Sequence, residues 1–221
     1  MTWAAVTLGL SSLALAAFPL VRPFFPFDPR TPAETLAGAS RAVTSPRWLV
    51  AHYLALIGFV LLLCVLPALH ARLSAGGAQP SARRATLLSG TGIALILPTL
   101  GVELYVLPAI GRLFLEGNAA VAPLVGSIYL GGATLVMLLG LVLLAVGAIM
   151  LATAIARSRS FPTWAGITFA VGLALWCPLL PPAVRVADGL LIGIGGIGLA
   201  CFGRWITPED AESRPTPRGV A

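Results

Sequence analysis

Residues 117–156 read GNAAVAPLVGSIYLGGATLVMLLGLVLLAVGAIMLATAIA and contain no charged side chain. A helix needs about 20 apolar residues to cross the hydrocarbon core of a bilayer. Transmembrane β-strands instead alternate over segments of about 10 residues. Irregular lipid-exposed backbone is excluded, because each unpaired amide in hydrocarbon costs several kcal/mol. This stretch therefore predicts a membrane-spanning α-helix.

Charge-poor runs of similar character occupy most of the chain. Within the quoted stretch, Asn118, Pro123 and Ser127 indicate that the first part is a loop. We predict an all-α fold, a polytopic membrane helix bundle with about six transmembrane helices. The expected spans are 2–21, 48–70, 86–110, 125–155, 162–180 and 184–206.

The composition supports this prediction. Of the 221 residues, 58% are hydrophobic and 10% are charged, with a mean hydropathy of +0.95. Soluble domains carry about 25% charged residues, so this chain has too little polar surface to coat a soluble particle. We expect residues 1–206 to form one transmembrane domain and the polar, proline-containing tail 207–221 to be disordered.

Two connecting or terminal segments need separate interpretation. Prolines at 23, 26, 29 and 32 prevent a continuous helix across residues 22–47. The first span contains Ala14-Leu15-Ala16, a triplet like a signal-peptidase site, but no basic segment precedes its apolar run. We expect it to be a membrane helix, with a cleaved signal peptide as the alternative.

The basic residues indicate a location. All fourteen are arginine, which suggests the coding bias of a GC-rich bacterial genome. They are scattered between apolar runs and form no basic face, so we expect no nucleic-acid partner. The loops with Arg72, Arg83 and Arg157 carry arginine without acidic residues, which favours a bacterial inner-membrane protein with both termini in the cytoplasm. The four arginines within residues 22–47 argue against this orientation.

Glu103 is the residue most indicative of a site, because it lies inside an expected span, where an ionised carboxylate is costly. It stands seven residues before the expected helix end, about 10 Å deep, and His52 would lie about 6 Å from the same boundary. A carboxylate–imidazole pair at this depth could relay protons or bind a cation. The candidate polar site comprises Glu103, His52, Tyr105, Tyr129 and Arg112.

The alternative is that these side chains only stabilise the bundle, since histidine and tyrosine are common near helix ends. Other chemistry has less support. His52 and His70 are about 27 Å apart along one helix, too far to hold one haem. The three cysteines share no metal-ligand spacing. We expect no metal, no cofactor and no enzymatic activity.

Glycine spacing in the last span predicts close helix packing. Gly189, Gly193 and Gly196 recur at intervals that let another helix approach. The partner helix could belong to the bundle, to a second copy of the chain or to another membrane subunit.

Three segments resemble a broad set of bacterial multi-helix membrane proteins that contain domains of unknown function. The segments are RWLVAHYLALIGFVLLLCVLPAL at 47–69, VELYVLPAI at 102–110 and PTWAGITFAVGLAL at 162–175. The matching features are His52, Glu103 and the helix entry Pro162-Thr163-Trp164. The resemblance implies the same multi-helix topology and no particular activity.

We therefore expect an integral membrane protein whose partner is the lipid bilayer. One hypothesis is a small transporter or proton-linked sensor that uses Glu103 and His52. The other is a non-catalytic scaffold subunit that docks a partner through its glycine-rich sixth helix.

Overall fold

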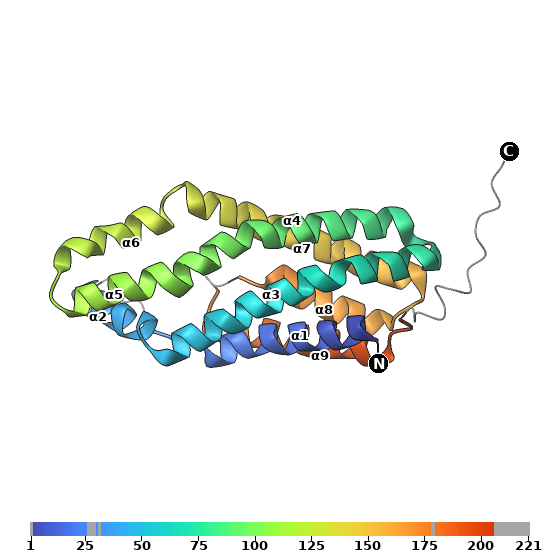
Figure 1. Ribbon diagram of the computed structural model, residues 1–221, viewed down its shortest axis with the longest axis horizontal. Coiled ribbons are helices and arrows are strands. Elements are labelled where there is room, and N and C mark those ends of the chain that lie inside the picture. Colours follow the sequence, from blue (N-terminus) through green and yellow to red (C-terminus); the bar gives the residue numbers. More distant parts are fainter. Residues whose placement is uncertain (1, 26–29, 31, 178–179, 206–221) are drawn as a thin grey trace.

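The described part of the chain is helical in every regular element. The computed structural model describes residues 2–25, 30, 32–177 and 180–205 (Figure 1). The tail 207–221 lies outside these residues. The helices are α1 (Trp3–Val21), α2 (Pro32–Val43), α3 (Pro46–Leu73), α4 (Gln79–Gly101), α5 (Leu107–Leu115), α6 (Ala122–Tyr129), α7 (Gly132–Ser158), α8 (Thr163–Leu175) and α9 (Pro182–Phe202), with short turns η1 (Ser74–Ala78), η2 (Val102–Val106) and η3 (Ala119–Val121).

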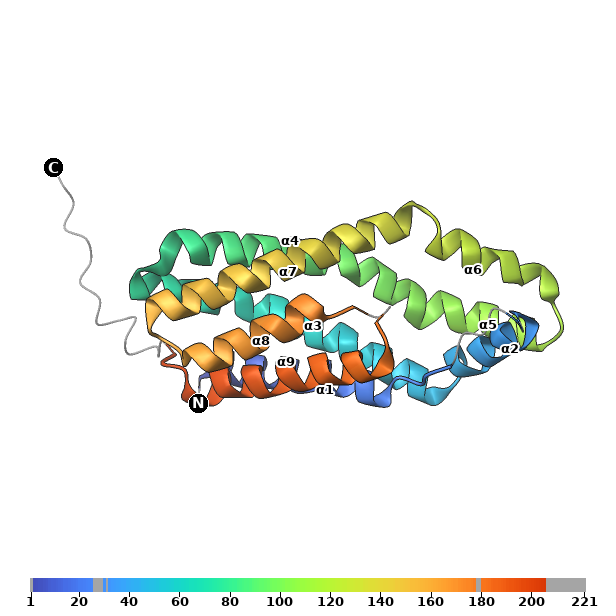
Figure 2. The same ribbon diagram turned by 180° about the vertical axis from the view of Figure 1, so that it is seen from behind.

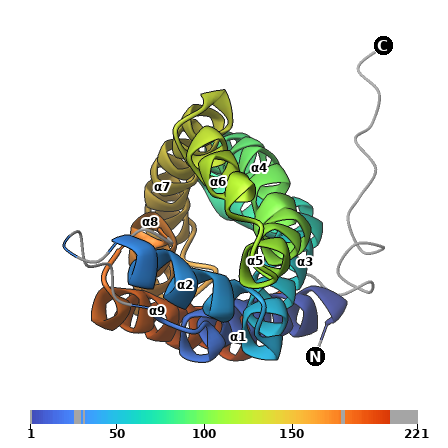
Figure 3. The same ribbon diagram turned by 90° about the vertical axis from the view of Figure 1, so that its left-hand side faces the viewer.

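Among the described residues, six helices close into a ring in the order α1, α3, α4, α7, α8 and α9, with α9 packed back against α1. The two side views agree on this arrangement (Figures 1 and 2), and the view along the bundle shows the ring end-on (Figure 3). Fully buried side chains from different helices fill its interior, among them Phe18, Phe59 and Phe169. Trp176 adds edge-on contact with Phe59 at 4.7 Å between ring centroids.

Four helical stretches are long and apolar enough to cross a bilayer. They are Trp3–Val21, the hairpin Pro46–Leu115, Gly132–Ser158 and Pro182–Phe202, whereas Ala119–Tyr129 and Thr163–Leu175 are shorter apolar helices. The hairpin turns at η1, where Gly77 has a φ of 85° that favours glycine. The protein is thus an all-helical bundle with several helices of membrane-spanning length.

Several helix ends differ from the expected ones, each for a local reason. Residues 32–43 form α2, because Pro32 occupies the first helical position, where its missing N–H breaks no bond. The helix expected to end at residue 110 continues to Leu115. The expected span 125–155 is divided by a break at Leu130 and Gly131. The helix expected to reach residue 180 ends at Leu175, because Pro178 follows shortly.

One end of the molecule extends beyond the ring. The α4–η2–α5 rod and α7 continue past the end of α1, and α2 and α6 lie there with α5, at the left of Figure 1 and the right of Figure 2. Helix α2 packs mainly against α5 and also contacts α3. We call this part, made of α2, α5, η3 and α6, the cap. The opposite end, at η1, holds the start of α1 and the end of α9.

Glycines permit the closest helix contacts. Gly189, Gly193 and Gly196 of α9 face α1, where added Cβ atoms would meet Pro19, Ala16 and Ser12. The last span therefore directs this glycine face toward α1 of the same chain. Between α4 and α7 the close contact is with backbone: a Cβ on Gly92 would stand 2.6 Å from the backbone nitrogen of Leu144.

Replacing Gly92 with valine should force α4 and α7 apart and destabilise the bundle by about 1–3 kcal/mol, because the clash is with backbone. Unfolding in detergent micelles, followed by circular dichroism, measures the change. Gly90→Ala on the same helix is the matched control, since its Cβ would make only ordinary contacts with the side chains of Leu66 at 3.8 Å and Leu63 at 3.9 Å. Equal effects of the two substitutions would contradict this packing.

Candidate functional site

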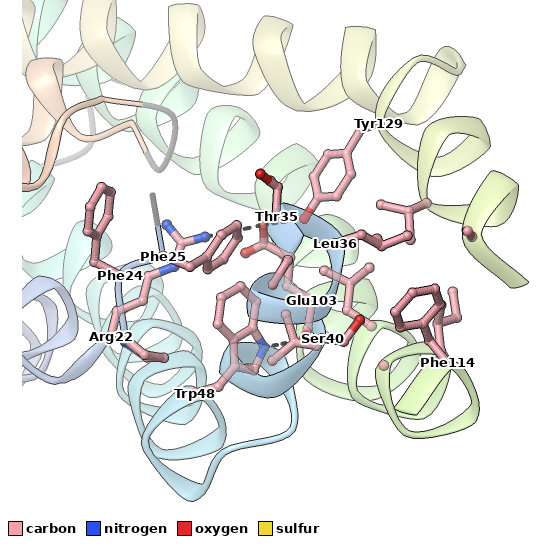
Figure 4. A pocket seen from close by; sticks show the side chains of 18 of the residues that line it. Arg22, Phe24, Phe25, Thr35, Leu36, Ser40, Trp48, Glu103, Phe114 and Tyr129 are labelled. Atoms are coloured by element: carbon pink, nitrogen blue, oxygen red, sulfur yellow. Dashed lines mark hydrogen bonds and ion pairs between the residues drawn. The ribbon is translucent and has the colours of Figure 1, made fainter. Parts of the chain in front are cut away.

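Glu103 lies where the cap meets the ring, and it is 4% exposed. It belongs to η2, a π-helical turn between α4 and α5. Its side chain lines a cavity of about 790 Å³ at this junction (Figure 4). A carboxylate buried this deeply requires partners for its oxygens.

Two side chains lie within hydrogen-bond distance of this carboxylate. The hydroxyl of Tyr129 donates to Oε1 at 3.1 Å. The Nε2 atom of His52 lies 3.0 Å from Oε2. Arg22 adds a longer ion-pair contact with Oε1, at 4.0 Å. Figure 4 shows Arg22 and Tyr129 directed toward Glu103 from different elements. The site thus joins the end of α1, α3, η2 and α6.

The π-helical turn explains how the backbone at Glu103 joins the site. The Leu107 N–H bonds to the Val102 carbonyl, five residues back. The next donor in that register would be residue 108, but Pro108 has no N–H. The Glu103 carbonyl instead accepts the indole N–H of Trp48 at 2.7 Å. Pro108 therefore creates the acceptor that anchors α3 to this turn.

His52 is held in one orientation. Its Nδ1 lies 2.7 Å from the Trp48 carbonyl oxygen, which can only accept a hydrogen bond, so Nδ1 carries a proton. The ring is fully buried, stacks on the Trp48 indole at 4.1 Å and meets the edge of Phe18 at 5.5 Å. Only Nε2, facing Glu103, is left to change its protonation.

This geometry requires one proton between Nε2 and Oε2. If the proton is on His52, an imidazolium faces a carboxylate; if it is on Glu103, a carboxylic acid donates to a neutral imidazole. Loss of the proton would place the Nε2 lone pair against carboxylate oxygen, without a hydrogen bond. The pair therefore stores one exchangeable proton next to the cavity.

Arg22 adds positive charge at the edge of this pair. It directly follows α1, and its guanidinium lies 4.9 Å from the Trp48 ring centroid and 5.7 Å from that of Phe18, both within cation–π range. Arg185 of α9 also lines the cavity and is close enough to Arg22 and Glu103 to interact with both electrostatically.

The rest of the cavity wall is mainly apolar. Helices α2, α5, α6 and α7 all contribute to it. These walls include Leu36, Val43, Leu107, Ile110, Phe114, Val125 and Met137.

The structure brings together only part of the predicted polar site. Glu103, His52 and Tyr129 are in contact, as described above. Tyr105 instead points outward, is 61% exposed and interacts with Tyr53. Arg112 is exposed on α5 and is not part of the cavity wall. A helix of 3.6 residues per turn cannot direct Glu103 and Tyr105, two positions apart, to the same face.

Sequence reasoning missed Trp48 and Arg22. Trp48 precedes His52 by four residues, the spacing that stacks two side chains on one helix face. Arg22 ends the first charge-free run of the sequence. Its contact with Glu103 depends on how the ring closes, which no local pattern shows.

Metal chemistry has no support within the described residues, where no group of three histidine, cysteine or acidic side chains could hold an ion. His70 lies at the end of α3, far along the helix from His52.

Comparisons with protein-family models, with curated proteins and with solved structures found no match. The site geometry must therefore carry the functional argument.

The bond from His52 to the Trp48 carbonyl predicts a nitrogen NMR signature. With ¹⁵N-labelled histidine, Nδ1 should remain protonated at every pH at which the protein stays folded, and only Nε2 should titrate or exchange. The chain has two histidines, so His70→Gln assigns the spectrum. A neutral form protonated only on Nε2 would contradict the assignment of this bond.

Proposed function

We propose that this chain is an integral protein of a bacterial inner membrane and acts as a proton-linked sensor rather than an enzyme. The observation that carries the proposal is the His52–Glu103 pair, with its single exchangeable proton, at the wall of a large cavity. A buried pair of this kind is a proton-responsive group, and the cavity gives it a place to meet a ligand.

Helix lengths support a membrane location. The 19 residues of α1 and the 21 of α9 extend about 28 and 31 Å, which matches a hydrocarbon core of about 30 Å. With 28 residues, α3 extends about 42 Å and projects beyond that layer. Arg22 at the end of α1 then marks one boundary, so Glu103 lies near the membrane surface and the cap extends outward.

Arginine placement supports cytoplasmic termini. At the η1 end, the described residues include six arginines and no acidic side chain. The cap end also has six arginines, but with four described acidic residues, of which Glu103 is one. Arg214 and Arg218 follow α9 in the sequence, so the side of the η1 end carries eight arginines against six, and an arginine excess is favoured on the cytoplasmic side. This directs the cap and its cavity outward.

The interior of the bundle favours a sensor over a transporter. Between the site and the η1 end, the ring is filled by buried apolar side chains, including Phe59, Leu62 and Leu69 of α3. A substrate moving through the ring would have to displace this packing. Response to a ligand at the cap needs no such path.

The scaffold alternative has less support. In that hypothesis a partner docks on the glycine face of the last helix. Gly189, Gly193 and Gly196, however, lie against α1. The large apolar side chains that α9 exposes include Leu190, Ile194 and Ile197, and apolar residues of this kind suit contact with lipid.

Helix α6 is the element that we expect to move with protonation. None of its residues is fully buried, and Tyr129 at its end ties it to Glu103 through one hydrogen bond. With the shared proton on Glu103, that bond is weaker than when the pair has lost the proton, since a neutral acid is a poorer acceptor than a carboxylate. The charged side chains near the pair are Arg22 and Arg185, and Asp188 acts electrostatically on Arg185.

The test is a distance measurement between spin labels at Glu34 of α2 and Leu124 of α6, both exposed, in lipid nanodiscs and with the native cysteines replaced by serine. The distance should change between pH 5 and pH 8 in the otherwise unaltered protein and should become insensitive to pH in Glu103→Gln. That substitution removes the proton acceptor but keeps nearly the same shape.

Glu116→Gln is the matched control, because Glu116 is an exposed carboxylate in the same cap. Its pH response should equal that of the parent. A parent protein without a pH-dependent distance, or a Glu103→Gln protein that still shows one, would refute proton-linked sensing.

A further inference from the structure

We infer that the cavity binds a single-chain amphipath with one anionic headgroup, of which a long-chain fatty acid is the type we commit to. The inference rests on the proposed function in using the same cavity, and it names the class of ligand. Three observations support the inference: the apolar walls of the cavity, the placement of two arginines, and the position of the cavity relative to the apolar layer.

Arg185 is the anchor for the headgroup. It lines the cavity near the start of α9, and its Nε is buried without a hydrogen-bond acceptor among the described residues. A buried guanidinium donor without an acceptor is costly, and a carboxylate can bind it through two parallel hydrogen bonds. Asp188, three residues on, attracts Arg185 only electrostatically.

Arg22 adds positive potential at the same part of the wall. It is engaged with Glu103 and the Trp48 ring, so it strengthens the attraction for an anion. Glu103 does not cancel the two arginines, because its charge is shared with the proton held by His52. The surroundings therefore favour an anion over a cation or a neutral group.

The apolar wall suits one hydrocarbon chain. From the arginines, the cavity continues between α2, α5, α6 and α7, past Leu36, Ile110 and Phe114. A volume of about 790 Å³ falls within the roughly 300–1,000 Å³ typical of pockets for drug-sized ligands. That space accommodates one acyl chain with a small headgroup better than a two-chain phospholipid.

The level of the cavity favours a ligand drawn from the bilayer. Arg22 directly follows α1, and Arg185 lies in the first turn of α9, so both guanidiniums stand where the apolar layer ends. Headgroups of an outer leaflet lie at this level. The acyl chain would then leave the lipid and lie beneath the cap, beside the titrating pair.

Binding of radiolabelled oleate to the full-length protein in phosphatidylcholine nanodiscs tests this inference. Oleate should bind saturably, and Arg185→Gln should weaken it by about tenfold, the loss expected for one charge-assisted hydrogen bond. Arg112→Gln is the matched control: an exposed arginine of the cap outside the cavity wall, whose loss should leave binding unchanged.

Two further measurements separate the sources of binding. Ala39→Phe places an aromatic ring in the cavity from α2 and should abolish binding, whereas methyl oleate, which lacks the charge, should not compete. Binding of lysophosphatidylglycerol in place of oleate would support the same ligand class with a phospholipid source. Equal competition by methyl oleate, no saturable oleate binding, or full binding by Arg185→Gln would overturn the inference.

Its failure is distinguishable from failure of the sensor proposal. If the cap distance still responds to pH through Glu103 but no anionic amphipath binds, only the ligand assignment is lost. If oleate binds through Arg185 while the distance ignores pH, the cavity is a lipid site without proton linkage.

Discussion

The structure depends on how a buried carboxylate at Glu103 is satisfied. His52, Tyr129 and Arg22 surround its side chain, and the Trp48 indole takes its backbone carbonyl. These partners come from three different parts of the chain, so the position of one acidic group fixes how α1, α3 and α6 meet. Without these partners the carboxylate would be an unpaired charge in apolar surroundings, which would destabilise the fold by several kcal/mol. Stability and chemical sensitivity therefore reside in the same few bonds.

Proline and glycine set the geometry that makes this possible. Pro108 removes a backbone donor and so presents the Glu103 carbonyl to Trp48. Gly92 lets α4 and α7 approach at backbone distance. Helix α4 continues into η2, which carries Glu103, and α7 follows α6, which ends at Tyr129. Two residues without functional side chains thus shape the surroundings of the reactive pair.

Much of the architecture follows from the sequence, because apolar runs in this chain are long and interrupted by arginine or proline. The all-helical class and the contact between His52 and Glu103 could be argued from hydropathy and rise per residue. The course of α5 beyond Ile110 and the break before α7 could not, since a π-helical turn and a short break leave the apolar composition of the run unchanged. The early end of α8 could have been predicted from Pro178, because a proline disfavours the helical conformation of the residue before it. The role of Arg22 could not be predicted from the sequence for another reason. Its contact with Glu103 depends on how distant segments of the chain pack together. Tyr105 and Arg112 were expected in the site from their depth along the helix. Depth does not determine which face of a helix a side chain occupies, and both side chains lie outside the site.

Ring closure between α1 and α9 also orders the events of biosynthesis. Helices α1 and α3 precede α9 in the chain and can pair before it is made, but the face of α1 that receives Gly189 and Gly196 stays uncovered until the last helix is complete. Arg185 reaches the neighbourhood of Arg22 only at that moment. The His52–Glu103 pair, formed by α3 and η2, can therefore assemble before α9 is made, while the part of the cavity wall that carries Arg185 is added last.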